Sequence, residues 1–289
     1  MRKPCFALKP RIITLNGSAI RIMSDTSFLQ AAAPRRLTGA TLVVTRPADS
    51  ARELIAPARA MGADTVALPG LALRISRRPT TALAQLRAAE DADICLFSSP
   101  ASVRFAFRLL PTLSLGQRGR ICAIGNASAR ALARHGIRAI VPQERSDSEG
   151  LLALPELADV RGQRIAIVGA AGGRDLIAPT LRERGATVDE IHVYERVPPR
   201  LTQQHFDALR RADDPLIMLV SSAQALTHLV ARLPPPLLAR LHRQTLIVSS
   251  ERLADIASSH GFGNITRARS ALVDDLLEAA ARALAHHRL

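Results

Sequence analysis

Short apolar runs alternate with longer amphipathic segments along most of the chain. The runs are rich in Val, Ile and Leu, and they include 41–46 (TLVVTR), 94–97, 121–124, 164–169, 217–220 and 246–248. Each is followed by about ten to fifteen residues whose apolar positions recur with the 3.6-residue period of a helix. The alternation predicts an α/β protein whose parallel sheets carry helices on both faces.

Glycine and proline mark the expected ends of these units. Gly62, Gly136, Gly185 and Gly261 each follow a helical segment and predict a left-handed helix end. The Pro-containing stretch 234–236 is expected to be a loop between two units.

The second half of the chain repeats the plan of the first. The segment 94–107 (ICLFSSPASVRFAF) matches 217–230 (IMLVSSAQALTHLV), 121–137 matches 246–262, and the unit that begins at 41 matches the unit that begins at 164. The offset is 123 positions from Ser98 to Ser221 and 125 from His135 to His260. A nearly constant offset indicates one internal duplication.

Small polar residues stand where the expected strands pass into helices. They are Ser98-Ser99, Gly125-Asn126-Ala127-Ser128, Gly169-Ala170-Ala171-Gly172-Gly173, Ser221-Ser222 and Ser249-Ser250. Helix N-termini carry unpaired N–H groups, and small residues let an anion approach them closely. At a single junction, a Ser or Asn is more often a helix N-cap. Their repetition in both halves favours a site for a ligand with several carboxylates or phosphates.

Other chemistries lack their motifs. The segment 169–173 (GAAGG) does not have the G-x-G-x-x-G order of a dinucleotide loop, and the serine pairs have no identifiable His–Asp relay. Cys5, Cys95 and Cys122 show no CxxC spacing, and the eight His show no metal-ligand spacing, so no metal is expected.

Length, hydropathy and charge narrow the classes of protein to which the chain can belong. A length of 289 residues suffices for two domains, and no apolar run approaches the roughly 18 residues that span a bilayer, so we expect a soluble protein without membrane contact. The net charge of +14 includes +6 from residues 1–37, and the remainder is scattered beside acids, so no nucleic-acid partner is expected.

Residues 1–37 lack a clear hydrophobic period and are expected to form a loose extension. Met23 is a candidate natural start, with 1–22 an upstream extension.

Four segments together resemble the uroporphyrinogen-III synthase family. They are 97–107 (FSSPASVRFAF), 123–137 (AIGNASARALARHGI), 146–157 (SDSEGLLALPEL) and 167–197, which ends in VYERV. The similarity covers about residues 38–285. The GNAS and VYER segments are its more specific parts, whereas the serine pairs are generic.

The resemblance implies two α/β domains of similar topology joined by a two-stranded linker. Domain one would combine 38–74 with 198–289, and domain two would be 79–189. The linker strands would be 71–76 and 191–197. The duplicated halves would therefore not coincide with the domains.

The resemblance also implies a cofactor-free lyase of tetrapyrrole biosynthesis. Such an enzyme cyclises hydroxymethylbilane to uroporphyrinogen III and inverts ring D through an azafulvene and a spiro intermediate. We also expect a cytoplasmic monomer that makes transient contact with hydroxymethylbilane synthase.

Site residues follow from the same resemblance. Tyr194, the only Tyr, would protonate or orient the leaving hydroxyl. The substrate's acetate and propionate arms would be bound by Arg46, Ser98, Ser99, Gly125, Asn126, Ser128, Gly169, Ser221, Ser222, Ser250 and Arg252. Two alternatives stay open: a non-catalytic two-domain binding protein for an acidic metabolite, and a nucleic-acid-binding protein that uses the positive charge.

Overall fold

The computed structural model describes residues 35–115, 119–145, 147–172 and 176–287, together with two short antiparallel strands, β1 (Thr14–Leu15) and β2 (Ser18–Ala19). The candidate start at Met23 lies outside the described residues, as does most of the expected extension. Within the part that is described, none of the helices has both the length and the apolar character that crossing a bilayer requires.

Five parallel strands form the first sheet, in the order β12-β11-β10-β3-β4. Their bounds are β3 (Thr41–Val44), β4 (Asp64–Ala67), β10 (Leu216–Val220), β11 (Thr245–Val248) and β12 (Ile265–Arg267). Successive side chains point to opposite faces of the sheet. Leu42 and Val44 therefore join one core cluster, whereas Val43 joins the other. Burial on both faces explains why these strands are continuously apolar.

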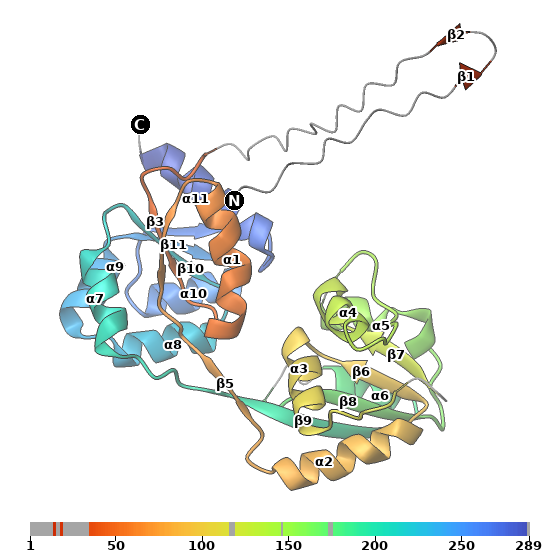
Figure 1. Ribbon diagram of the computed structural model, residues 1–289. Helices are drawn as coiled ribbons and strands as arrows, with labels where there is room; N and C mark the ends of the chain where they lie inside the picture. The colour runs from red at the N-terminus through yellow and green to blue at the C-terminus, as the bar shows by residue number, and fades with distance from the viewer. Residues whose placement is uncertain are drawn as a thin grey trace, which may run out of the picture.

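Helices cover both faces of the first sheet (Figure 1). On the face of Leu42 and Val44 lie α1 (Ala48–Ala60) and α11 (Val273–His287). The opposite face carries α7 (Gln203–Arg211), α8 (Ala223–Arg232), α9 (Pro235–His242) and α10 (Glu251–Ser259).

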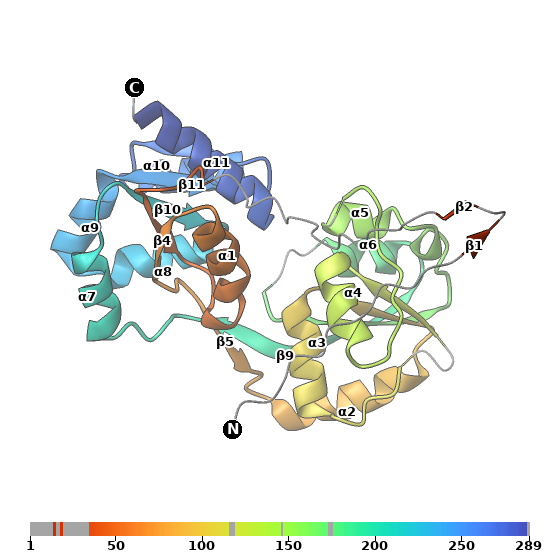
Figure 2. The ribbon, with the colours of Figure 1, turned by 45° about the horizontal axis from the view of Figure 1, so that its top comes forward.

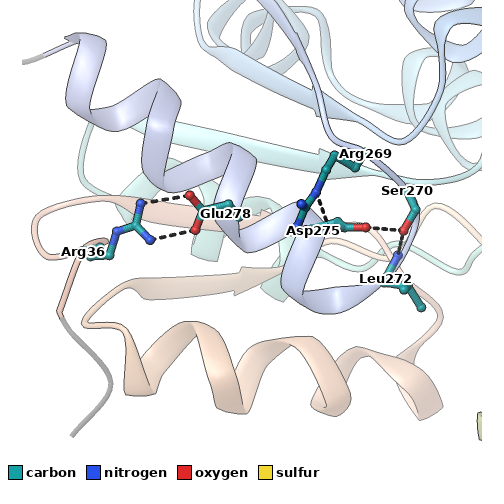
Figure 3. A network of polar contacts seen from close by, with 6 residues as sticks. All are labelled: Arg36, Arg269, Ser270, Leu272, Asp275 and Glu278. Atoms are coloured by element: carbon teal, nitrogen blue, oxygen red, sulfur yellow. Dashed lines mark hydrogen bonds and ion pairs between the residues drawn. The ribbon is translucent and has the colours of Figure 1, made fainter. Parts of the chain in front are cut away.

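Polar contacts fix the start of α11 and join it to the segment before β3 (Figure 3). Arg36 donates to both carboxylate oxygens of Glu278, at 2.7 and 3.0 Å. Asp275, in the first turn of α11, accepts hydrogen bonds from Ser270 Oγ at 2.6 Å and Arg269 Nε at 3.0 Å. The Ser270 hydroxyl and, less strongly, the Arg269 guanidinium hold the pKa of Asp275 below its usual value.

The second sheet has the order β5-β9-β8-β6-β7. Its strands are β5 (Ala72–Ile75), β6 (Ile94–Phe97), β7 (Arg120–Ala123), β8 (Arg164–Ala170) and β9 (Thr187–Val197). All neighbours are parallel except β5, which runs antiparallel to β9.

This sheet is also covered on both faces. Cys95 and Phe97 of β6 join a cluster with residues of α2 (Pro79–Ala88), the 3₁₀ turn η1 (Ala89–Asp91), α3 (Pro100–Leu109) and α4 (Asn126–Ala133). Ile94 and Leu96 join a cluster with α5 (Ser148–Leu152), the 3₁₀ turn η2 (Pro155–Leu157) and α6 (Ile177–Glu183). None of the four core clusters of described residues mixes the two sheets.

Two strands connect the sheets. β5 and the C-terminal half of β9 pair antiparallel, from Ala72 opposite Val197 to Ile75 opposite Tyr194. The figures show the two layered units at either end of this ribbon (Figures 1 and 2). The predicted α/β class with two βα units of similar topology is confirmed by this architecture.

The two sheets have the same strand order when their strands are matched according to the internal repeat. The order β11-β10-β3-β4 in the first sheet corresponds to β7-β6-β8-β9 in the second. Next to β11 lies β12, which begins at Ile265, and next to β7 lies a single bridge from Cys122 to Ile140. Each copy of the repeat thus supplies two of these strands to each sheet.

The predicted glycine ends are confirmed, because Gly62, Gly136, Gly185 and Gly261 have φ values between 75° and 90°. The prediction of a loop at 234–236 is wrong. Pro234 is the N-cap of α9 and Pro235 is its first residue, a position where proline has no N–H to lose and its φ suits the helix.

Candidate active site

In both sheets, the predicted polar junctions follow the carboxyl ends of parallel strands. In the second sheet, β6 leads to Ser98 and Ser99, β7 to Gly125 and Asn126, and β8 includes Gly169. In the first, β3 leads to Arg46, β10 to Ser221 and Ser222, and β11 to Ser249 and Ser250. Each sheet therefore gathers its own set of predicted residues at one edge.

Three of the serines cap helices. Ser222 Oγ accepts from Ala225 N of α8, and Ser250 Oγ accepts from Leu253 N of α10, both at 3.3 Å. Ser99 caps α3 in a reciprocal pair with Ser102, whose amide lies 3.0 Å from Ser99 Oγ. These hydroxyls satisfy N–H groups that the helices leave unpaired.

Ser98 and Gly169 lie against each other across neighbouring strands. Ser98 Oγ donates to the carbonyl of Val168 at 3.2 Å. A Cβ on Gly169 would lie 2.7 Å from that Oγ, closer than side chains normally approach. Glycine at this position therefore leaves room for the Ser98 hydroxyl.

Ser99 also pairs with the predicted catalytic residue. Its Oγ lies 3.1 Å from the hydroxyl of Tyr194, which comes from β9. Tyr194 is 3% exposed, and its ring stacks on Phe105 of α3 with centroids 5.2 Å apart. The Tyr194 ring is thus held on one side by packing, while its hydroxyl meets the strand-to-helix turn.

An irregularity in β9 sets the direction of Tyr194. Gly169 pairs with His192, but Ala170 pairs with Tyr194, so β9 contains one extra residue. As a result, Val193 and Tyr194 are both buried in the same cluster, although neighbours in a regular strand face opposite sides.

The α4 junction holds a buried hydroxyl without a protein partner. Ser128 is 1% exposed, and its Oγ makes no hydrogen bond. It lies in the first turn of α4, just after Gly125 and the exposed Asn126. An unsatisfied buried hydroxyl costs stability and is a candidate for a ligand or water contact.

Arg46 is half-buried at the end of β3. Its Nη2 donates to the carbonyl of Ala271 at 2.5 Å. Burial lowers the pKa of Arg46 from its ordinary value, while the nearby Glu53 opposes the shift. Arg252 is exposed in the first turn of α10.

A contact that sequence reasoning missed joins the two layered units. Arg104 of α3 lies 2.6 Å from Asp49, which follows Arg46 by three residues in the first turn of α1. Figure 2 shows α1 and α3 facing one another between the two units. No sequence signal connects residues 55 positions apart on different helices.

Two hollows elsewhere among the described residues contain none of the predicted residues. One of about 480 Å³ is lined by Pro199, Arg200, Leu201, Phe206 and Arg232, and one of about 790 Å³ lies between 158–163, which follows η2, and 183–185 at the end of α6. We place the candidate site at the junctions, because the partnerless Ser128 hydroxyl and the Ser99–Tyr194 pair lie there. Among the described residues, no group of three or more His, Cys, Asp and Glu could hold a metal ion.

Sequence comparisons assign a family to this arrangement. A family model described as uroporphyrinogen-III synthase HemD matches residues 52–278. The uroporphyrinogen-III synthase of Escherichia coli (strain K12) is 32% identical over 254 residues, covering 83% of this chain and 99% of that protein. That of Salmonella typhimurium (strain LT2) is 31% identical over 248 residues, with the same shares covered.

Solved structures share the fold. Uroporphyrinogen-III synthetase from Helicobacter pylori 26695 aligns with a TM-score of 0.57 at 16% identity, covering 84% of this chain and 99% of that one. A mutant uroporphyrinogen III synthase from the extremely thermophilic bacterium Thermus thermophilus aligns with a TM-score of 0.53 at 20% identity, covering 86% and 99%. At these identities the likeness concerns the fold alone.

Proposed function

The chain belongs to the uroporphyrinogen-III synthase family, and from this premise we propose that it converts hydroxymethylbilane into uroporphyrinogen III. The observation that carries the proposal is the extent of the family match. Residues 52–278 include most of both sheets and both connecting strands, so the similarity is not confined to one βα unit. Membership favours an enzyme, a cyclising lyase, over a protein that binds an acidic metabolite without turnover.

The reaction requires the protein to control the geometry of the bound substrate. Hydroxymethylbilane loses its terminal hydroxyl as water and becomes an azafulvene, whose electrophilic carbon is attacked by the substituted carbon of the last pyrrole. The resulting spiro intermediate fragments and recloses with ring D reversed. Unassisted closure gives the unrotated isomer, so the site must hold the chain ends in one attack arrangement.

We propose that the Tyr194–Ser99 pair assists departure of the hydroxyl. Ser99 Oγ has two lone pairs and one proton. The Ser102 N–H uses one lone pair, and a proton donated by Tyr194 would use the other. The Ser99 proton is then free to be donated to the leaving oxygen, which departs as water, and the pyrrole N–H proton released as the azafulvene forms returns to the Ser99–Tyr194 pair. This arrangement agrees with the burial of Tyr194, because half-buried Ser99 is the member of the pair nearer solvent.

Carboxylate binding is assigned to both sets of junctions. Arg46 and Arg252 would supply charge, and helix-terminal amides would supply N–H donors. The small residues in this role are Ser98, Gly125, Asn126, Ser128, Gly169, Ser221, Ser222 and Ser250. The capping bonds of Ser222 and Ser250 leave each hydroxyl its own proton for such an acid.

We propose that the units work as two domains, with 38–74 and 198–289 in one, 79–189 in the other, and 71–76 and 191–197 as linkers. The separate core clusters support this division. The proposal also includes a cytoplasmic monomer that receives its unstable substrate through transient contact with hydroxymethylbilane synthase.

The test is a coupled assay with freshly generated hydroxymethylbilane. We expect type III product to dominate when the protein is present and type I when it is omitted. An isomer ratio unchanged by the purified protein would contradict the proposal. Tetrapyrrole binding without such a change would support the binding-protein alternative.

A further inference from the structure

Arg104 is an arginine whose acidic partner comes from the opposite unit. It lies on α3, which packs on the second sheet, and its Nη2 is 2.6 Å from Asp49 Oδ2 on α1, which packs on the first. The pair therefore joins two helices that belong to different core regions.

The position of Arg104 relates it to the proposed chemistry. Its guanidinium lies 5.8 Å from the centroid of the Phe105 ring, and that ring also stacks on Tyr194 with centroids 5.2 Å apart. Asp49 lies in the helix that follows Arg46. The Arg104–Asp49 pair thus connects α3, the helix that Ser99 caps, with α1, the helix that begins two residues after Arg46.

Exposure argues against a permanent link. The side chains of Arg104 and Asp49 are 47% and 43% exposed. Water and salt screen an ion pair of this kind, so its attraction is small compared with that of a buried pair. A carboxylate that arrives on a polyacid can therefore take the place of Asp49 without a large penalty.

We infer that Arg104 is a substrate-binding residue and that Asp49 occupies its carboxylate position in the free protein. An acetate or propionate arm of the linear tetrapyrrole displaces Asp49 and pairs with the guanidinium. Arginine suits this exchange because its planar fork binds any carboxylate in the same geometry. The inference rests on the proposed function, since it names one contact of that substrate.

The experiment compares Arg104→Gln with Asp49→Asn. If a substrate carboxylate displaces Asp49, the two substitutions should change KM in opposite directions. Loss of the guanidinium is expected to raise the KM for hydroxymethylbilane about tenfold or more, as for loss of a charge-assisted hydrogen bond. Loss of the competing acid is expected to lower KM about two- to fivefold, the range for an exposed ion pair. The double variant is expected to behave like Arg104→Gln.

Arg108→Gln is the matched control, since it removes one positive charge from an exposed position one turn further along α3. Its KM is expected to match wild type, and circular dichroism checks that all variants fold. If Asp49→Asn and Arg104→Gln raise KM alike, the pair is a structural link and the inference is wrong. It is also wrong if the charge-swapped variant, Asp49→Arg with Arg104→Asp, restores wild-type KM, or if neither single variant changes KM. If the wild-type protein forms no type III product, the proposed function itself fails.

Discussion

Replacing Tyr194 by Phe separates a catalytic hydroxyl from a packing ring. The substitution removes one atom, the oxygen 3.1 Å from Ser99 Oγ, and keeps the stacking on Phe105. The net stability contribution of such a hydrogen bond is about 0.5–1.5 kcal/mol. We therefore expect Tyr194→Phe to fold and to lose only about 1 kcal/mol of unfolding free energy in a denaturant titration.

The expected effect on turnover is larger than the effect on stability. Proton donation by a positioned side chain typically raises the rate of the chemical step about 10²- to 10⁴-fold. If Tyr194 holds the Ser99 proton toward the leaving oxygen, kcat should fall about a hundredfold, while KM changes little because no carboxylate contact is removed. The coupled assay, with type I and type III products resolved, measures both quantities.

Ser99→Ala provides the second side of a double-mutant cycle. It should lower kcat at least as much and also cost about 1 kcal/mol of stability through the lost N-cap. Because the hydroxyls act in series, the double variant should lose no more kcat than Ser99→Ala alone. Wild-type kcat in Tyr194→Phe, or losses that multiply in the double variant, would refute the reasoning.

Three further outcomes are expected. Gly169→Ala should keep the protein folded but raise KM, because the new Cβ displaces the Ser98 hydroxyl; unchanged kinetics would show that Ser98 binds no substrate. Burial raises the pKa of Cys95 to about 12 and that of Cys122 to about 11. Both thiols stay protonated at pH 8, so mass spectrometry should find them unalkylated by iodoacetamide until denaturant is added, and rapid native labelling would contradict their burial. Arg240→Ala should lower the unfolding free energy by about 2 kcal/mol or more, because it removes a guanidinium that donates to three backbone carbonyls; an unchanged denaturation midpoint would contradict this.

Much of the fold was predictable, because burial on both faces of a sheet produces continuous apolar strands. The unbroken sequence of β10 and the glycine after α10 are local signals that need no knowledge of the partner elements. The prediction of a loop at 234–236 failed because proline breaks a helix in its interior but is favoured at its first position. Only the apolar period after the prolines distinguishes these two cases. The direction of β5, a four-residue strand beside a long one, has no local signal.

The site was predictable only in outline. The junction serines could be found, but whether their hydroxyls cap a helix or face a ligand depends on side-chain rotation. The Tyr194–Ser99 and Arg104–Asp49 contacts join residues 95 and 55 positions apart, and they depend on a strand irregularity and on the placement of two units. Neither leaves a pattern in one sequence.

Because each copy of the repeat supplies strands to both sheets, cutting the chain between the copies does not separate the two sheets. A polypeptide with a single copy, containing β3, β4, β6 and β7, would hold with these strands two of the five in each sheet and complete neither. Two such polypeptides could reach a full structure only by exchanging halves, as an intertwined pair. The present chain is the covalent form of that pair, so fragments cut between β7 and β8 should refold when mixed and remain unfolded when kept apart.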